Sequence, residues 1–107
     1  MLDIGKIAYF VAPSRIHGEG LFAAQPIFPG QIVDLAFIEK QSAGGKYPDI
    51  TYFGSKLNHS YFPNVRLQRF GNKFFIKAIK VIPSRHELLV NYSETPSYIM
   101  KPGRNFT

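Results

Sequence analysis

Apolar residues in this chain occur in short runs that end at glycine or proline, a pattern typical of β-strands joined by turns. The runs predict strands at residues 4–11, 21–23, 32–38, 65–70, 73–79 and 87–91. Phe28-Pro29-Gly30-Gln31 has proline and glycine at the central positions of a type II turn. Gly71-Asn72, between two of the runs, indicates a two-residue hairpin. The polar segments 14–20 and 41–47 contain pairs of glycines and are expected to be loops.

One helix of one or two turns is expected before Leu57, with Asp49 as its N-cap. Gly54 lowers the helix propensity of this segment. The pattern therefore predicts a mostly β chain with short strands, many turns and little helix.

Length and composition indicate one folded domain over residues 1–107, with a core at about 4–92 and a short tail at 93–107. Hydrophobic residues make up 45% of the chain and include ten Phe, enough to form a core. The absence of Cys excludes disulfides and thiolate zinc sites. No apolar run approaches the roughly 18 residues of a membrane span, and the N-terminus lacks a signal-peptide layout. We expect a soluble intracellular protein, cytoplasmic or nuclear and not secreted.

The formal net charge of +6 raises the question of nucleic-acid binding. Lys and Arg are scattered along the chain, with a modest density between Arg66 and Arg85. A solvated basic surface accounts for this distribution, so nucleic-acid contact remains a secondary possibility.

The segment Leu57-Asn58-His59-Ser60-Tyr61-Phe62-Pro63-Asn64 is polar where its flanks are apolar. Asn and Ser side chains compete with backbone hydrogen bonding, and Pro63 lacks an N–H. The segment is therefore expected at a turn, where its amide and imidazole groups bond to the backbone or to a ligand.

Three motifs carry a resemblance to a known family. They are Asn58-His59-Ser60-x-x-Pro63-Asn64, Gly18-Glu19-Gly20-Leu21-Phe22-Ala23 upstream, and Glu87-Leu88-Leu89-Val90-Asn91-Tyr92 downstream. In this order, over residues 4–92, they resemble SET-domain protein lysine methyltransferases of the minimal viral or bacterial type, without zinc-binding flanks. The resemblance implies a SET-domain (β-clip-like) fold of small curved sheets. In that fold the C-terminal part threads under a preceding loop as a pseudoknot.

The resemblance also implies a reaction, the transfer of a methyl group from S-adenosylmethionine to a lysine ε-amine, which leaves S-adenosylhomocysteine. Such a site must align the two reactants and exclude water. It must also receive a neutral amine, although the free lysine pKa is about 10.4. Tyr92 matches the catalytic tyrosine. The residues matching the family's cofactor site are His17, Gly18, Glu19, Gly20, Asn58 and His59, together with Tyr92. No metal is implied.

Departures from the family pattern affect the substrate groove. The insert between Ile38 and Leu57 is short, which leaves Tyr47 and Tyr52 to line a lysine channel. The tail has no zinc ligands, so closing the channel falls to Tyr98 or Phe106. The implied substrate is a histone tail or another basic protein, and a homodimer could supply the missing groove surface.

Each motif residue also has a structural interpretation when it is taken alone. Tyr92 could be a core tyrosine, His59 a structural histidine, and Gly18-Glu19-Gly20 an ordinary turn. The alternative function is a non-catalytic basic β-domain that binds nucleic acid or protein. In that case the 65–79 hairpin could stack bases and hold phosphates, through the interleaved Arg66, Arg69, Phe70, Lys73, Phe74 and Lys77.

Overall fold

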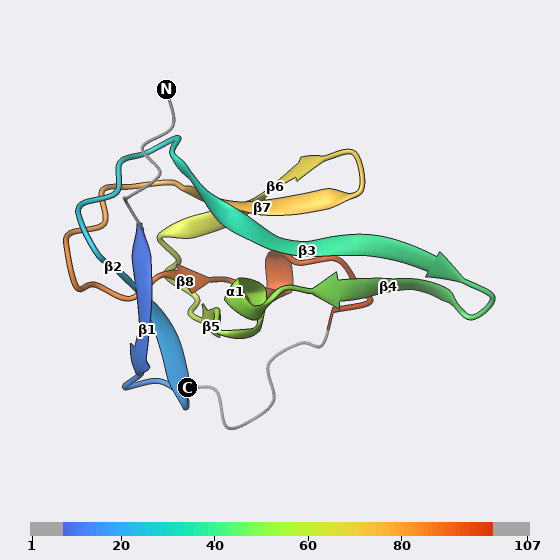
Figure 1. Cartoon of the computed structure of the whole chain (residues 1–107), viewed down its shortest axis with the longest axis horizontal. Helices are drawn as coiled ribbons and strands as arrows, with labels where there is room; N and C mark the ends of the chain where they lie inside the picture. The colour runs from blue at the N-terminus through green and yellow to red at the C-terminus, as the bar shows by residue number, and fades with distance from the viewer. Residues whose placement is uncertain (1–7, 100–107) are drawn as a thin grey trace.

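The computed structural model describes residues 8–99, which form three small β-sheets with two short helical segments (Figure 1). β1 (Tyr9–Pro13) pairs antiparallel with β2 (Glu19–Ala23). The largest sheet has the order β4 (Gly45–Ile50), β3 (Ile32–Ser42), β7 (Lys73–Ala78) and β6 (Val65–Phe70). The third sheet pairs β5 (Asn58–His59) with β8 (Leu89–Val90). The helical segments are α1 (Tyr52–Ser55) and the 3-10 turn η1 (Tyr92–Glu94). The predicted mostly β fold with little helix is confirmed.

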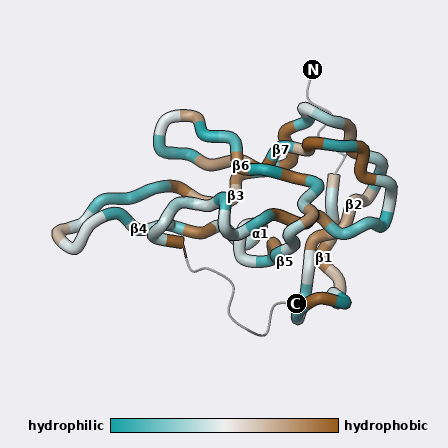
Figure 2. The backbone as a smooth tube through the Cα atoms, turned by 180° about the vertical axis from the view of Figure 1, so that it is seen from behind, coloured by the Kyte–Doolittle hydropathy of each residue, from teal (hydrophilic) through white to brown (hydrophobic). Residues whose placement is uncertain are grey.

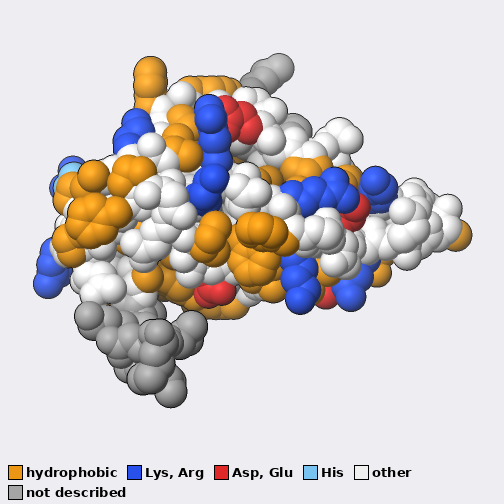
Figure 3. All heavy atoms as spheres, turned by 90° about the horizontal axis from the view of Figure 1, so that it is seen from above, with side chains coloured by type: hydrophobic (Ala, Val, Ile, Leu, Met, Phe, Trp, Pro, Cys, Tyr) orange, Lys and Arg blue, Asp and Glu red, His pale blue; other side chains and the backbone are white. Residues whose placement is uncertain are grey.

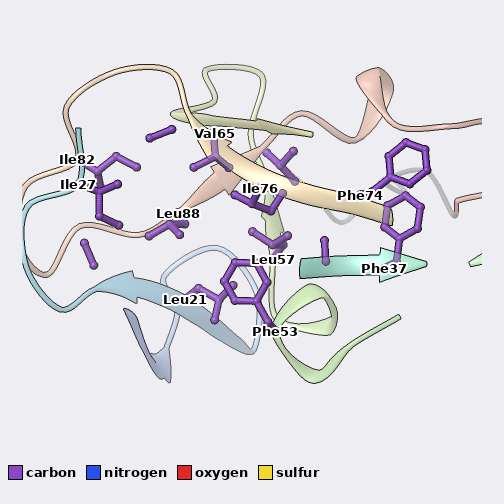
Figure 4. Close-up of a cluster of buried hydrophobic side chains, with 14 residues drawn as sticks. Leu21, Ile27, Phe37, Phe53, Leu57, Val65, Phe74, Ile76, Ile82 and Leu88 are labelled. Atoms are coloured by element: carbon purple, nitrogen blue, oxygen red, sulfur yellow. The ribbon is translucent and has the colours of Figure 1, made fainter. Parts of the chain in front are cut away.

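The core lies where the three sheets meet (Figure 4). Leu21 of β2, Ile76 of β7 and Leu88 beside β8 are fully buried. The rings of Phe37 and Phe74 stack at 4.5 Å between adjacent strands of the largest sheet. Figure 2 shows apolar backbone segments in the middle of the molecule and hydrophilic ones toward the tip of the β3–β4 hairpin. Neither helical segment in the described range has the length or apolar character needed to cross a membrane.

Two turns form where local chemistry predicted them. The Gln31 N–H donates to the Phe28 carbonyl at 3.0 Å, which closes the Pro29-Gly30 turn. Gly71-Asn72 connects β6 to β7, and Phe70 and Lys73 form the last pair of the hairpin.

The prediction of a loop at residues 41–47 is wrong. β3 continues to Ser42 and β4 begins at Gly45, so only two residues form the turn and the segment projects as a hairpin. Pairing with β3 therefore outweighs the low strand propensity of this glycine-rich segment. Pro48 is compatible with the hairpin because β4 is an edge strand, on which the missing N–H disrupts no ladder. The loop expected at 14–20 is also shorter, since β2 begins at Glu19.

The cap of α1 is Thr51 and not Asp49, which is paired with Ile38 in the β3–β4 hairpin. The Thr51 hydroxyl accepts from the Gly54 N–H at 3.0 Å and lies 2.6 Å from the Leu35 carbonyl, to which it donates. Gly54 lets α1 approach β3 closely, because a Cβ there would lie 2.1 Å from the Ala36 carbonyl oxygen. The glycine that weakens the helix in isolation is therefore required by its packing.

The C-terminal strand is shorter than the predicted 87–91. β8 contains two residues, and Glu87 forms only an isolated bridge with Phe22. Tyr92 begins η1 and does not end the strand. Asn91 caps this turn, since its Oδ1 accepts from the Ser93 N–H at 3.0 Å.

Candidate functional site

Parallel pairing of β5 with β8 brings together segments about thirty residues apart in the chain. Asn58 pairs with Leu89 and His59 with Val90. The Asn64 side chain links the two segments by hydrogen bonds to the backbone in and next to β8. Its amide donates to the Glu87 carbonyl at 2.8 Å and accepts from the Leu89 N–H at 2.8 Å. The polar motif at 57–64 therefore positions the segment that leads to Tyr92.

The Asn58 side chain connects β5 to the segment before β2. This residue is buried, and its amide nitrogen lies 3.0 Å from the His17 carbonyl and 3.1 Å from the Glu19 carbonyl. A third acceptor, the Glu87 carboxylate, lies at 2.8 Å. Asn58 therefore fixes the position of His17, Gly18, Glu19 and Gly20 relative to β5.

Glu87 is a member of this cluster that sequence reasoning did not assign to the site. Its carboxylate accepts from the Ser14 hydroxyl, 2.9 Å from each oxygen, and from the Asn58 amide. A Cβ at Gly20 would lie 2.1 Å from the Glu87 carboxylate, so this glycine is needed for the packing of the cluster. The signal in the sequence was a carboxylate directly before the apolar run 88–90, since such a group requires partners when it is half-buried.

His59 orients the start of η1. Its ring is 4% exposed, and Nδ1 accepts from the Tyr92 N–H at 3.0 Å. Nδ1 must therefore be unprotonated, which leaves the neutral tautomer with its proton on Nε2. Burial lowers the pKa of His59 and favours this neutral form. The imidazole also packs against the rings of Tyr61, at 4.3 Å, and Tyr92, at 5.2 Å.

The Tyr92 phenol donates a hydrogen bond of 2.5 Å to the Leu57 carbonyl. Burial raises the pKa of the phenol, so it stays protonated at neutral pH. The hydroxyl therefore has a fixed direction, and its oxygen retains the capacity to accept a hydrogen bond.

An apolar cavity of about 370 Å³ adjoins Tyr92. Its apolar walls include Phe37 of β3, Ile50 of β4, Leu57, and Leu67 of β6. Its polar side chains are those of His17, Ser55, Tyr92 and Thr95. This volume lies within the roughly 300–1,000 Å³ range of small-molecule sites.

The predicted cofactor residues divide into two groups around this cavity. His17 and Tyr92 line it. Gly18, Gly20, Asn58 and His59 are not among its lining residues but are linked to it through the hydrogen bonds described above. The Glu19 carboxylate points elsewhere and pairs with the Lys56 ammonium at 2.9 Å.

The predicted channel tyrosines lie outside the walls of this cavity, and their role remains a prediction. Tyr47 is 46% exposed and lies on β4 on the opposite side from Ile50. Tyr52 is 66% exposed, with the Lys56 ammonium 5.3 Å from its ring centre. Tyr98 donates to Glu39 at 2.7 Å, and burial with this hydrogen bond raises the pKa of Tyr98 to about 12. Phe106 lies outside the described residues.

Comparisons with known proteins identify the fold. No protein-family model and no curated protein matches the sequence. A solved structure of a Plasmodium falciparum protein, provisionally named a histone methyltransferase, matches with a TM-score of 0.67 at 17% identity, over 84% of this chain and 96% of that chain. A chain of Polycomb Repressive Complex 2 from Chaetomium thermophilum matches with a TM-score of 0.69 at 20% identity. An apo form of the complex with substitutions in Ezh2 gives 0.68 at 21% identity.

These likenesses extend over most of this chain but only a small part of the Polycomb chains. The two matches cover 88% and 85% of this chain, and 17% and 16% of the respective Polycomb chains. At such low identity the comparison establishes the fold alone. The chain has a SET-like fold.

Proposed function

We propose that this chain is an S-adenosylmethionine-dependent protein-lysine N-methyltransferase. The observation that carries the proposal is the position of the Tyr92 phenol, in the wall of an apolar cavity and directed by its bond to Leu57. The bond from the Tyr92 N–H to His59 ties this phenol to β5. The SET-like fold and the Plasmodium falciparum neighbour, provisionally named a histone methyltransferase, support the same reaction class.

The cofactor would be held by His17, Gly18, Glu19, Gly20, Asn58 and His59, with Tyr92 at its reacting end. Two features fit such a group. The cavity beside His17 and Tyr92 has the volume and apolar lining of a small-molecule site. At Gly18 the surrounding space is open, so a ligand can approach the backbone closely. When bound, S-adenosylmethionine supplies a methyl group on a sulfonium and leaves as S-adenosylhomocysteine.

The residues of the chain would act by placement and by excluding water. The Tyr92 phenol stays protonated and is therefore not a general base at neutral pH. Its oxygen can accept a hydrogen bond from the incoming amine and so orient the nitrogen lone pair. The apolar walls formed by Phe37, Ile50 and Leu67 disfavour an ammonium, which lowers the pKa of an entering lysine.

The proposed substrate is a protein that presents a lysine, either a histone tail or another basic protein. The name of the Plasmodium neighbour supports the histone assignment. Although the net charge of this chain is +6, the carboxylates of Glu19 and Glu94 lie at its surface, and a basic segment could replace their present partners Lys56 and Arg66. Tyr47, Tyr52 and Tyr98 remain the proposed channel residues, and a homodimer could complete the groove.

The test combines calorimetric titration with S-adenosylmethionine and radiolabelled methyl transfer to purified histones and to cell lysate. We expect Tyr92→Phe to bind the cofactor normally and to lose about 100-fold in transfer rate, because the amine loses its orientation. Tyr61→Phe is the matched control. It removes the same hydroxyl from a ring that contacts the same imidazole but is 65% exposed. Full transfer activity in Tyr92→Phe would exclude the proposed role of this residue, and a wild-type chain that does not bind the cofactor would refute the function.

A further inference from the structure

The four-stranded sheet has one face on the core and one face open to solvent. Successive side chains of a strand point to opposite faces. Phe74, Ile76 and Ala78 of β7 are at most 6% exposed and cover the core. The alternate residues Lys73, Phe75 and Lys77 therefore point outward. We call the face on which they lie the outer sheet face.

The strand register extends this face across the neighbouring strands. Residues paired directly across adjacent strands share a face. Lys77 lies beside Arg66 of β6, and Lys73 lies between Phe70 of β6 and Ile38 of β3. Two residues of the set predicted for nucleic-acid contact face the core side. These are Phe74, which is buried, and Arg69, whose guanidinium lies 5.2 Å from the Phe74 ring centre and 3.3 Å from Glu39.

The outer sheet face exposes aromatic surface. Phe70 is 57% exposed, and its ring meets the edge of Phe75 at a centroid distance of 5.7 Å. Ile32, at the far end of the face, is 40% exposed. A rigid strand thus holds a ring at the surface, where it can stack on a planar ligand.

The lysines of this face are available to an anion. Lys40 lies two residues after Ile38 on β3 and therefore on the same face. Lys73, Lys77 and Lys40 form no ion pair with a carboxylate of the described residues, whereas Arg66 pairs with Glu94 at 3.3 Å. Asp49, paired with Ile38, lies at the β4 edge of the face. Figure 3 shows a side of the molecule with this mixed character, on which Lys and Arg lie among hydrophobic side chains and few acidic groups are visible.

We propose that the outer sheet face binds single-stranded nucleic acid. Bases stack on Phe70, and the lysines at positions 40, 73 and 77 hold phosphates. Exposed rings on an open sheet, combined with unpaired cations, are the two elements that sequence-tolerant single-strand binding requires. This face lies on the opposite side of the sheet from Phe37 and Leu67, which line the cavity. Tyr47, paired with Lys40, is the one proposed channel residue on β4 that shares the outer sheet face.

Three other occupants fit the face less well. A second copy of the chain would place lysines against lysines, and like charges repel within about 10 Å at ordinary salt. A regular duplex keeps its bases stacked inside and gives Phe70 no base to stack on. An acidic peptide would neutralise the lysines but would leave the exposed ring without a planar partner. A single strand satisfies both the charge and the ring.

The test measures fluorescence anisotropy of a labelled 20-nucleotide oligo(dT) strand between 50 and 200 mM salt. Three phosphate contacts predict a slope of log affinity against log salt of about −2, at about −0.7 per contact. Lys73→Gln with Lys77→Gln should reduce this slope to about −0.7. The control pair, Arg15→Gln with Arg85→Gln, removes two exposed cations elsewhere and should keep the slope near −2. Both variants lower the net charge from +6 to +4, so a difference between them cannot come from the net charge.

A second pair of variants, each losing one exposed phenylalanine ring, tests the stacking of bases. Phe70→Ala should weaken binding at least about 5-fold, the lower limit for loss of one stacked base. Phe10→Ala removes a ring that is 37% exposed from β1, which belongs to a different sheet, and should leave binding unchanged. The proposal is overturned if the wild-type chain does not bind at 50 mM salt or if both charge variants weaken binding equally. It is also overturned if Phe70→Ala has no effect, or if duplex or polyglutamate binds as tightly. Thermal melting establishes that each variant is folded, and cofactor titration of the same samples tests the methyltransferase proposal separately.

Discussion

Replacing Gly54 by Ala tests whether packing or helix propensity controls α1. The Cβ of an alanine would lie 2.1 Å from the Ala36 carbonyl oxygen and 2.8 Å from its carbonyl carbon. Both atoms belong to the backbone of β3, which cannot rotate away as a flexible side chain could. The helix must therefore move off the sheet, and Thr51 moves with it.

Opposing contributions set the size of the effect. Alanine favours a helix over glycine by about 1 kcal/mol. Forcing a methyl group into a filled contact costs about 1–3 kcal/mol. The displacement also weakens the bonds of Thr51 to the Leu35 and Ala36 carbonyls, at 2.6 and 3.0 Å, each contributing about 1 kcal/mol. We expect a net loss of about 2 kcal/mol in the free energy of unfolding.

Urea unfolding followed by circular dichroism measures this change. Gly44→Ala is the matched control, because its Cβ would meet only the Ser42 hydroxyl oxygen at 3.9 Å. The control should be neutral or slightly more stable, since alanine restricts the unfolded chain. A Gly54→Ala variant as stable as the wild type would refute the packing argument.

Two further predictions concern stability. His59 has a lowered pKa in the folded state, so the unfolded chain takes up the proton first. The free energy of unfolding should therefore be highest above about pH 6.5 and fall as the pH drops below this value. In urea titrations at pH 5.5 and 7.5, His59→Gln should flatten this dependence while the exposed His86→Gln retains it. Arg85 has a φ of 69°, which costs a non-glycine residue about 1–2 kcal/mol. Arg85→Gly should raise stability by about 0.5–1 kcal/mol after the entropy cost of glycine, whereas Ser84→Gly should lower it; a destabilised Arg85→Gly would contradict this account.

Local chemistry was sufficient to predict the turns, because their geometry depends on a few adjacent residues. Pro29-Gly30 and Gly71-Asn72 formed as expected. The 41–47 segment was misjudged for the opposite reason. This segment forms a strand because it is hydrogen-bonded to β3, and its own residues have no local property that predicts this pairing. The helix cap shifted from Asp49 to Thr51 because the hairpin extends as far as Ile50.

The sequence pattern identified the site as a set of fragments, and only the family resemblance implied how the fragments are arranged. Resemblance selected His17, Asn58, His59 and Tyr92, and the structure links these residues through backbone and side-chain hydrogen bonds. Periodicity could not predict the parallel β5–β8 pairing, which depends on tertiary contacts. The part played by Glu87 depends on three partners that are distant in sequence, so it emerged only from the structure.

The short parallel pairing of β5 with β8 has a consequence for the order in which the chain folds. Because β5 and β8 must meet across a long intervening segment, their contact has a high loop-closure cost and is rewarded only after the β6–β7 hairpin has formed between them. We therefore expect the proposed site around Tyr92 to be among the last parts of the molecule to assemble. A partly folded chain would then have the four-stranded sheet but no fixed Tyr92 phenol, so the proposed activity would require completed folding.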